Sequence, residues 1–230
     1  MAVIINIDTS SPICSVALAI DGEIVLGLES SQQMDHSASL APYVKKCLDY
    51  LKDKGIKLDA VSVAVGPGSY TGLRIGLSLA KGLAFGMSIP MIALSSLQIL
   101  SVRAIFSYHD FAGDELIVPM VDARRLEVFT GVYDSALQKI IPEQPLILDE
   151  NSFWELYEKE KVLFIGDGSE KFKNLYKGEN AVWLGARLSH AKFMVTLSEK
   201  LFRNNQFSDI AYTVPNYLKE YQTTTPKCKI

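Results

Sequence analysis

The sequence has little of what marks a disulfide-rich, metal-binding or membrane-spanning protein. Its three cysteines are widely spaced and form no C-x-x-C pair, which argues against a disulfide framework or a cysteine zinc site. Its three histidines include no pair at metal-ligand spacing, so we expect no bound metal. The longest apolar stretch is interrupted by Arg74, Lys81 and Pro90, whereas a membrane span needs about 20 mostly uncharged residues.

The chain also has no large excess of positive or negative charge. Lys and Arg total 23 against 26 Asp and Glu, a formal net charge of −3, which argues against a general polyanion binder. Hydrophobic residues make up 48% of the 230 residues, enough for a substantial core and unlike a disordered chain. The N-terminal segment has no basic region of the kind that begins a secretion signal. We therefore expect a cytoplasmic protein without membrane contact, built as one large domain or two small lobes.

The first half of the chain alternates between predicted strands and helices. Strands are expected over 3–8, 13–20 and 23–30, with a hairpin turn at Asp21-Gly22. A helix follows to about residue 51, because its apolar residues recur with a 3.6-residue period: Leu40, Tyr43, Val44, Cys47, Leu48 and Leu51. Then come a buried strand over 60–66, a glycine-rich loop, a helix over 73–87, a strand over 91–94 and a third helix capped by Ser95 or Ser96.

The second half repeats the outline of the first. An apolar strand ending in Asp122, a polar turn and a returning strand over 126–134 match the opening hairpin, although sequence identity between the halves is low. A strand region broken by two prolines, a helix near 152–159, a buried strand over 162–166 and a last helix over 189–203 follow, and we expect the tail over 223–230 to be frayed. The pattern predicts an α/β protein of two related lobes, residues 1–108 and 109–230.

The loop GPGSYTGLRIG, residues 66–76, lies between a buried strand and a helix, where backbone N–H groups can bind an anion. The P-loop motif is absent, and the third glycine comes one position too late for the dinucleotide motif. Small residues recur every four positions along the helix at Gly72, Gly76, Ala80 and Ala84. The pattern favours close packing or an interface over a phosphate site, and this nearly all-apolar helix needs a second layer that another chain could supply.

Two further clusters carry weaker functional signals. Asp8, Thr9 and Ser10 follow the first strand, where a carboxylate and hydroxyls can hold a metal–phosphate group, as in an actin-like ATPase, or can simply cap a turn. Asp122 and the turn Gly166-Asp167-Gly168 in the second half improve the match to a nucleotide site. Arg124 and Arg125 could contact phosphate, but the sequence favours a solvated pair beside Glu127.

Taken in order, several segments resemble the TsaB (YeaZ) family over nearly the whole chain. They are IDTSSPICSVAL, the His36-Ser37 pair before a helix, GPGSYTGLRIGLSLAKGLA, SSLQIL, VDARRLEVF, GDGS and the late P-x-YLK. The resemblance implies an actin-like fold (ASKHA, ribonuclease H-like) with two lobes and duplicated mixed sheets flanked by helices. It also implies a non-catalytic paralogue of the threonylcarbamoyltransferase TsaD. TsaD resembles a metal enzyme with an H-x-x-x-H pair. Here His36 matches the first histidine, but Leu40 stands at the position of the second. We therefore expect no catalytic residues and no metal.

The function implied by the resemblance is that of a scaffold subunit. It would dock on TsaD and, with the ATPase TsaE, support synthesis of N6-threonylcarbamoyladenosine beside the tRNA anticodon. We expect a TsaD heterodimer, a homodimer when TsaD is absent, and only indirect tRNA contact. No cofactor of its own is expected, with weak or interface-shared ATP or ADP left open. A Gly76→Leu substitution is expected to abolish the heterodimer while leaving the fold largely intact.

The resemblance assigns the partner interface to the helices over 38–51 and 73–87. The expected interface residues are Leu40, Tyr43, Val44, Cys47, Leu73, Arg74, Gly76, Leu77, Ala80, Lys81 and Ala84. A vestigial nucleotide site is expected at Asp8, Thr9, Ser10, Asp122, Gly166 and Gly168. The alternatives are an actin-like small-molecule kinase or ATPase, a metallopeptidase-like protein (a glycoprotease homologue) and a plain homodimeric structural protein.

Overall fold

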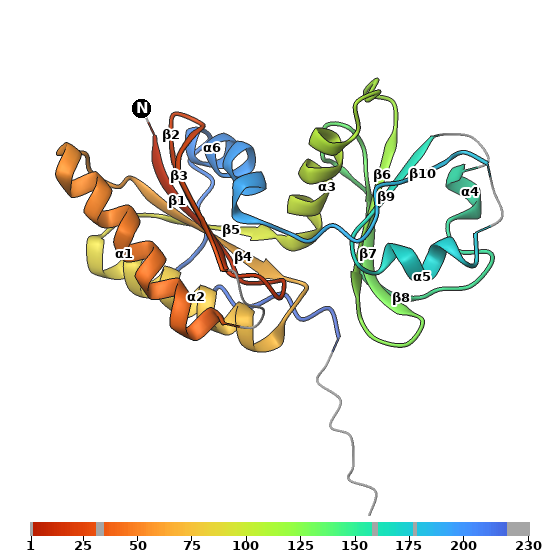
Figure 1. Ribbon diagram of the computed structural model, residues 1–230, viewed down its shortest axis with the longest axis horizontal. Helices are drawn as coiled ribbons and strands as arrows, with labels where there is room; N and C mark the ends of the chain where they lie inside the picture. Colours follow the sequence, from red (N-terminus) through yellow and green to blue (C-terminus); the bar gives the residue numbers. More distant parts are fainter. Residues whose placement is uncertain (1, 31–34, 158–160, 177–178, 220–230) are drawn as a thin grey trace, which may run out of the picture.

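The computed structural model describes residues 2–30, 35–157, 161–176 and 179–219. It contains two five-stranded mixed sheets whose strand orders repeat each other, β3-β2-β1-β4-β5 and β8-β7-β6-β9-β10. In each sheet the central strand pairs antiparallel with the next strand of its hairpin and parallel with the strand on its other side. The expected duplication of an α/β, actin-like two-lobe fold is therefore confirmed (Figure 1).

The first lobe is built from the strands and helices that the sequence predicted. Its elements are β1 (Val3–Asp8), β2 (Ser15–Ile20), β3 (Glu23–Glu29), α1 (His36–Lys54), β4 (Ala60–Gly66), α2 (Tyr70–Met87), β5 (Met91–Ser95) and α3 (Ser96–Ser107). Gly55 ends α1 in the left-handed conformation. Ser69 caps α2 by accepting a hydrogen bond from the Gly72 N–H, and Ser95 caps α3 in the same way.

The second lobe departs from the sequence prediction in its shorter elements. It contains β6 (Leu116–Asp122), β7 (Glu127–Tyr133), β8 (Lys139–Ile147), α4 (Trp154–Tyr157), β9 (Val162–Ile165), α5 (Ser169–Lys173) and β10 (Ala181–Trp183). The two prolines do not break β8, because β8 is an edge strand and an edge strand tolerates missing N–H donors. The helix expected near 152–159 is only α4 within the described residues, and the tail over 223–230 lies outside them.

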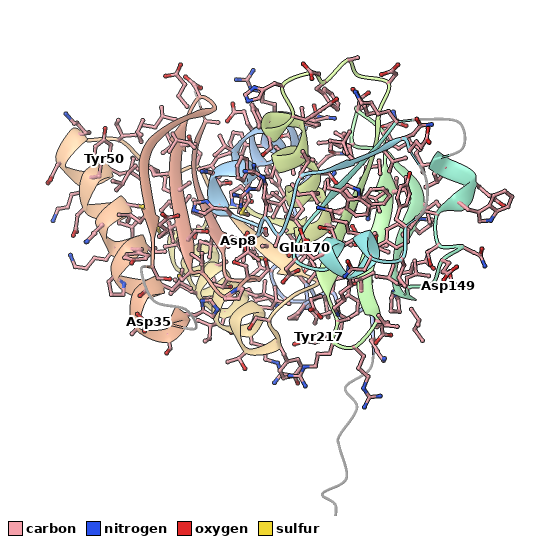
Figure 2. All side chains as sticks on the ribbon, turned by 45° about the vertical axis from the view of Figure 1, so that its right-hand side comes forward. Asp8, Asp35, Tyr50, Asp149, Glu170 and Tyr217 are labelled. Carbon is pink, nitrogen blue, oxygen red and sulfur yellow. The ribbon has the colours of Figure 1, made fainter. Side chains whose placement is uncertain are left out.

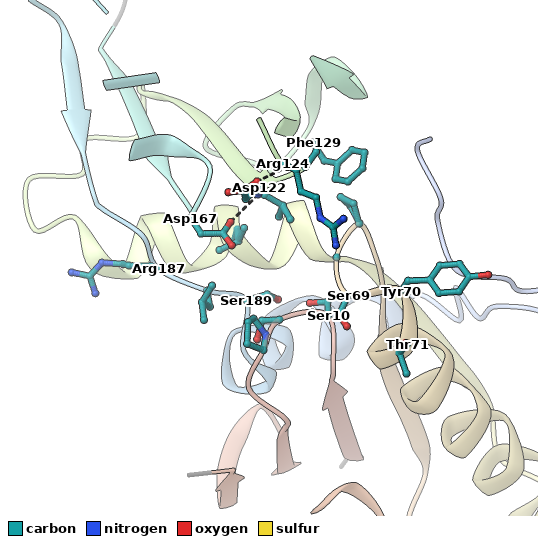
Figure 3. Close-up of a pocket in the computed structure, with 18 residues that line it drawn as sticks. Ser10, Ser69, Tyr70, Thr71, Asp122, Arg124, Phe129, Asp167, Arg187 and Ser189 are labelled. Carbon is teal, nitrogen blue, oxygen red and sulfur yellow. Dashed lines mark hydrogen bonds between the residues drawn. The ribbon is translucent and has the colours of Figure 1, made fainter. Parts of the chain in front are cut away.

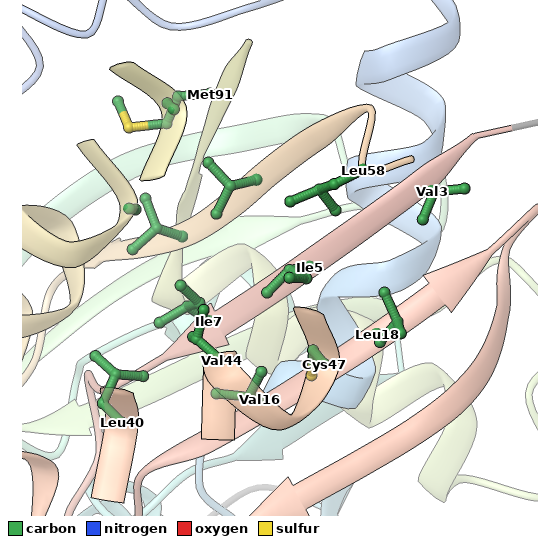
Figure 4. Close-up of a cluster of buried hydrophobic side chains, with 14 of the residues drawn as sticks. Val3, Ile5, Ile7, Val16, Leu18, Leu40, Val44, Cys47, Leu58 and Met91 are labelled. Carbon is green, nitrogen blue, oxygen red and sulfur yellow. The ribbon is translucent and has the colours of Figure 1, made fainter. Parts of the chain in front are cut away.

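The two faces of the first sheet are covered by different helices. Alternate residues of β1 point to opposite faces, so Val3, Ile5 and Ile7 pack against α1 and α2 (Figure 4). Ile4 packs on the other face, against α3 and α6 (Val195–Arg203). Figure 2 shows α1 running along the outer side of this lobe, from Asp35 to Tyr50. Both faces of the central strand are thus buried, which explains its unbroken apolar sequence.

Helix α3 lies between the two sheets and joins their cores. Its Ile99 and Val102 pack into the first sheet's core, whereas Leu97 and Leu100 pack with Ile117 and other residues of the second sheet. A buried helix between two sheets needs apolar residues on two sides. This explains why α3 is apolar over most of its length and fixes how the lobes face each other.

The chain after β10 returns to the first lobe, so residues 191–203 pack on the first sheet rather than on the second. The segment continues through η1 (Ala191–Met194), a 3₁₀ turn, into α6, which packs on β1 and β5. Residues 205–219, here called the C-terminal strap, then run from β5 to the second lobe. The strap's Ser208 exchanges hydrogen bonds with Met91 and Ala93 of β5. Within the described residues, no helix is long and apolar enough to cross a membrane.

Candidate functional site

A cleft of about 490 Å³ opens where the loops of the two lobes meet. The first lobe contributes the turn after β1, including Ser10, and the start of α2 at Ser69. The second lobe contributes Asp122, Arg124 and the turn at Asp167, and the returning chain adds Arg187 and Ser189. Figure 3 shows Arg124 reaching down from the second lobe toward the loop that bears Ser69. This placement follows from the duplicated topology, because corresponding ends of the two sheets face each other.

Asp8 lies beneath this cleft with both carboxylate oxygens occupied by the chain itself. Oδ1 accepts hydrogen bonds from the Ser10 N–H (2.9 Å) and from the Ser10 hydroxyl (2.6 Å). Oδ2 accepts from the Ser189 hydroxyl, which belongs to the returning segment. Asp8 is completely buried and does not line the cleft. In this geometry its carboxylate organises the turn rather than facing a ligand.

Thr9 is also used internally, at the contact between the turn and α2. Its hydroxyl donates to the Gly72 carbonyl at 2.7 Å. A Cβ at Gly72 would lie 2.1 Å from the Thr9 carbonyl oxygen, and a Cβ at Gly76 would lie 2.3 Å from Thr9 Oγ1. Both positions therefore require glycine for close approach of α2 to its own lobe. The four-residue spacing of small side chains reflects packing within this chain.

Gly68 shows the same requirement at the loop before α2. Its φ is +158°, and a Cβ there would lie 2.2 Å from the Ser10 carbonyl oxygen. The adjacent Ser69 N–H donates to that carbonyl at 2.7 Å. The glycine-rich loop is thus attached to the turn after β1, which places the start of α2 at the wall of the cleft.

The second lobe repeats this arrangement around the end of β6. The Asp122 N–H donates to Asp167 Oδ1 at 2.9 Å, and the Asp122 carboxylate accepts from Lys171 Nζ at 2.6 Å. Burial is the main cause that raises the pKa of Asp167 above its ordinary value, and the neighbouring Asp122 charge adds to it. A Cβ at Gly166 would lie 2.0 Å from the Met120 carbonyl oxygen, and one at Gly168 would lie 2.7 Å from Val128. These glycines let the turn pack on β6 and β7.

Of the six residues expected to form a nucleotide site, only Ser10 and Asp122 line the cleft. Asp8 and Thr9 lie behind its wall, and Gly166 and Gly168 serve packing. The cleft also contains Ser69, Arg187 and Ser189, which no sequence motif assigned to a site. Ser69 could have been recognised as the N-cap of the following helix. Nothing in the sequence around Arg187 or Ser189 predicts that the chain returns to this cleft.

His36 is the first residue of α1 and is almost fully buried. Neither ring nitrogen has a hydrogen-bond partner among the described residues. Burial lowers the pKa of His36, although the charges of Asp8 and Asp35 act in the opposite direction. Leu40 lies one turn further along α1, in the apolar core. Within the described ranges, no group of three or more His, Cys, Asp or Glu side chains is arranged to hold a metal ion.

Most of the expected interface residues face the core of their own lobe. The buried ones are Leu40, Val44, Cys47, Leu73, Gly76, Leu77, Ala80 and Ala84. Tyr43 is partly exposed and donates its hydroxyl hydrogen to the Glu29 carbonyl. A residue covered by its own sheet has no surface to offer a partner, so any docking face must use the opposite sides of α1 and α2.

The remaining two expected residues contact the C-terminal strap. Arg74 is exposed, donates from Nε to Tyr217 Oη at 3.0 Å, and lies over the Tyr70 ring at 4.0 Å. Lys81 Nζ donates to the Ala211 carbonyl at 3.2 Å. Both residues hold the strap against α2.

The outward side of α2, here called the outer face, carries Ser78, Gly82, Phe85, Gly86 and Met87. Phe85 is 81% exposed and Met87 44% exposed, both large apolar side chains on a helix that is otherwise well packed. A Cβ added at Gly82 or Gly86 would meet nothing within 4 Å. The outer face therefore combines exposed apolar side chains with glycines that leave room for a close neighbour.

Comparison with known proteins gives consistent matches over most of the chain. The family model described as TsaD, tRNA N6-adenosine threonylcarbamoyltransferase, matches residues 29–229. A Bacillus subtilis protein, "tRNA threonylcarbamoyladenosine biosynthesis protein TsaB", is 32% identical over 94% of this chain and 93% of its own length. The Escherichia coli protein of the same name is 27% identical, with 94% of each chain covered.

Solved structures agree with the sequence matches. YeaZ from Pseudomonas aeruginosa superimposes with a TM-score of 0.74 at 27% identity, covering 95% of this chain and all of that one. A second Pseudomonas aeruginosa structure, of an uncharacterised protein with similarity to peptidase YEAZ, has a TM-score of 0.77 at 26% identity and covers the same shares. The sequence motifs, the duplicated fold and these matches lead to one conclusion: this chain belongs to the TsaB (YeaZ) family, within the wider TsaD family.

Proposed function

We propose that this chain is a scaffold subunit without an active site of its own, acting in the synthesis of N6-threonylcarbamoyladenosine in tRNA. Relatives that align over nearly the whole chain are named as biosynthesis proteins for this modified nucleoside. The subunit would dock on TsaD and, together with TsaE, hold TsaD in an active form in the cytoplasm. It would form a homodimer when TsaD is absent, and tRNA would be bound mainly by the partner.

The outer face of α2 is the observation that carries this proposal. An 81% exposed Phe85 beside Gly82 and Gly86 is a surface that gains stability when another apolar helix covers it. The exposed side of α1 continues the same surface, because α1 and α2 are neighbours on one face of the first sheet. A partner that carries a similar helix pair can therefore bury both helices at once.

The hydrogen bonds of the Asp8 carboxylate support a chain without its own active site. In a metal-nucleotide enzyme of this fold, a carboxylate at the end of the first strand must face the ligand. Here the Asp8 oxygens accept hydrogen bonds from Ser10 and Ser189, and the side chain is fully buried. Using Asp8 for a metal would require breaking these bonds and moving the returning segment.

The test is light scattering after size exclusion, with this chain alone and mixed with TsaD of the same genome. We expect a one-to-one complex that replaces any homodimer. Nucleosides from tRNA incubated with threonine, bicarbonate, ATP and the remaining proteins of the pathway should then contain the modified adenosine only when this chain is present. Full modification without this chain, or steady ATP hydrolysis by the chain alone, would refute the scaffold proposal.

A further inference from the structure

A second groove, of about 700 Å³, lies beside the cleft and outside the outer face of α2. One wall is the turn between β6 and β7, the opposite wall is the start of α2, and the end of the C-terminal strap closes one side. We call it the arginine groove, after Arg124 and Arg125 in the β6–β7 turn.

The arginine groove carries an unbalanced positive charge. Arg124 and Arg125 make no ion pair with any described residue, and both side chains are exposed. The other two charged residues that line the groove, Lys219 and Glu127, neutralise each other at 2.7 Å. The groove is therefore lined by two consecutive arginines whose guanidinium groups suit carboxylates, which arginine binds in bidentate geometry.

The backbone of the two arginines is unusual for their residue type. Arg124 has φ +72° and Arg125 has φ +52°, two consecutive left-handed residues in a tight turn. Glycine and asparagine adopt this conformation readily, whereas other residues do so at a cost in stability. The β6–β7 turn thus contains arginine where a turn selected for stability alone would contain Asn-Gly.

The groove also exposes aliphatic side chains next to these charges. Leu126 is 51% exposed and Ile147 is 71% exposed, and both line the groove. Leu126 precedes β7 and Ile147 ends the neighbouring β8, and the Leu148 N–H donates to the Leu126 carbonyl. Nucleic acid offers phosphates for the arginines but no aliphatic groups for these side chains. A peptide with acidic and aliphatic residues satisfies both.

We propose that the arginine groove binds an acidic peptide segment of a protein partner, with carboxylates on Arg124 and Arg125 and an aliphatic side chain on Leu126 and Ile147. An extended segment suits this groove because its alternate side chains point the same way, so several of them can contact one wall. The proposal concerns a surface distinct from the outer face of α2, so each can fail without the other.

The experiment measures fluorescence anisotropy of a labelled peptide of alternating glutamate and leucine, added to the full chain. We expect saturable binding that weakens as salt is raised. The informative variant is Arg124→Asn with Arg125→Gly, because it removes both charges and gives the turn its preferred residues. This variant should bind at least about tenfold more weakly while its melting temperature stays equal or rises.

Two controls separate the proposal from its alternatives. Lys54→Gln with Lys57→Gln removes two exposed charges at the far end of α1 and should leave binding unchanged. Leu126→Ser with Ile147→Ser should weaken binding without lowering the melting temperature, because both side chains are already exposed. An arginine variant that binds the peptide as tightly as the parent would overturn the proposal. Absence of peptide binding would also overturn it. So would an oligouridine probe that binds more tightly than the peptide and whose affinity is unchanged by the Leu126 and Ile147 substitutions.

Discussion

The Ser189 hydroxyl donates a hydrogen bond to the buried carboxylate of Asp8, joining residues 181 positions apart in the chain. Ser189 belongs to the segment that returns from the second lobe, and Asp8 ends the first strand. This contact completes the turn below the cleft. The first lobe therefore includes residues that follow the whole second lobe in the chain.

Ser189→Ala should lower the free energy of unfolding by about 1–3 kcal/mol, because it leaves a buried carboxylate oxygen without its donor. Urea denaturation measures this loss. A double-mutant cycle with Asp8→Ala isolates the coupling between the two residues. Fully additive effects of the two substitutions would contradict the described contact. Ser37→Ala, at an exposed position of α1, is the matched control and should be near neutral.

Gly76→Ala and Gly82→Ala form a matched pair within α2. The first should destabilise the protein, because the new Cβ would lie 2.3 Å from Thr9 Oγ1. The second meets open space and should be neutral or stabilising by up to about 1 kcal/mol, because alanine is the better helix former. Thermal unfolding of both variants provides the test. Equal melting temperatures would show that α2 does not approach the turn as described.

The same geometry changes the expected result for Gly76→Leu. The sequence suggested loss of the heterodimer with the fold intact, whereas a leucine here would displace Thr9 and disrupt the lobe itself. Circular dichroism of the isolated variant should show reduced stability before any partner is added. A variant as stable as the parent would restore the earlier expectation.

Phe85→Glu should prevent complex formation with TsaD while leaving the melting temperature nearly unchanged. Its side chain is 81% exposed, so little packing is lost in the free chain, but a charge would be buried in the complex. Size exclusion with light scattering reports the complex. Phe106→Glu on α3, another exposed phenylalanine, serves as the control and should retain it. Loss of the complex in both variants would point away from the outer face of α2.

His36 should make the protein less stable in mild acid. Its pKa in the folded state is depressed, chiefly by burial, below the ordinary value of 6.5. The unfolded chain therefore binds a proton that the folded chain does not. The stabilisation is fully present above pH 6.5 and is lost as pH falls from there through the lowered pKa. Urea midpoints measured across this range should fall less steeply for His36→Phe than for the parent, and parallel curves would refute the assignment.

Most of the local structure could be predicted from the sequence alone. The strand and helix periods, the Asp21-Gly22 turn and the Gly55 helix end are local effects, and each lies where the pattern predicted. The matching hairpins after β1 and β6 also indicated two related lobes, because each half repeats the same order of apolar strands. The family resemblance required only motifs and their order.

The tertiary structure decided which face each residue uses and which distant segments meet. Spacing identified the small residues of α2, but the same spacing suits an internal contact or a partner, and only the position of Thr9 settles which one Gly76 makes. Asp8 looked like a ligand-binding carboxylate until the return of the chain brought Ser189 to it. Local sequence encodes periodicity and turn geometry, whereas contacts across a long separation depend on how the layers pack.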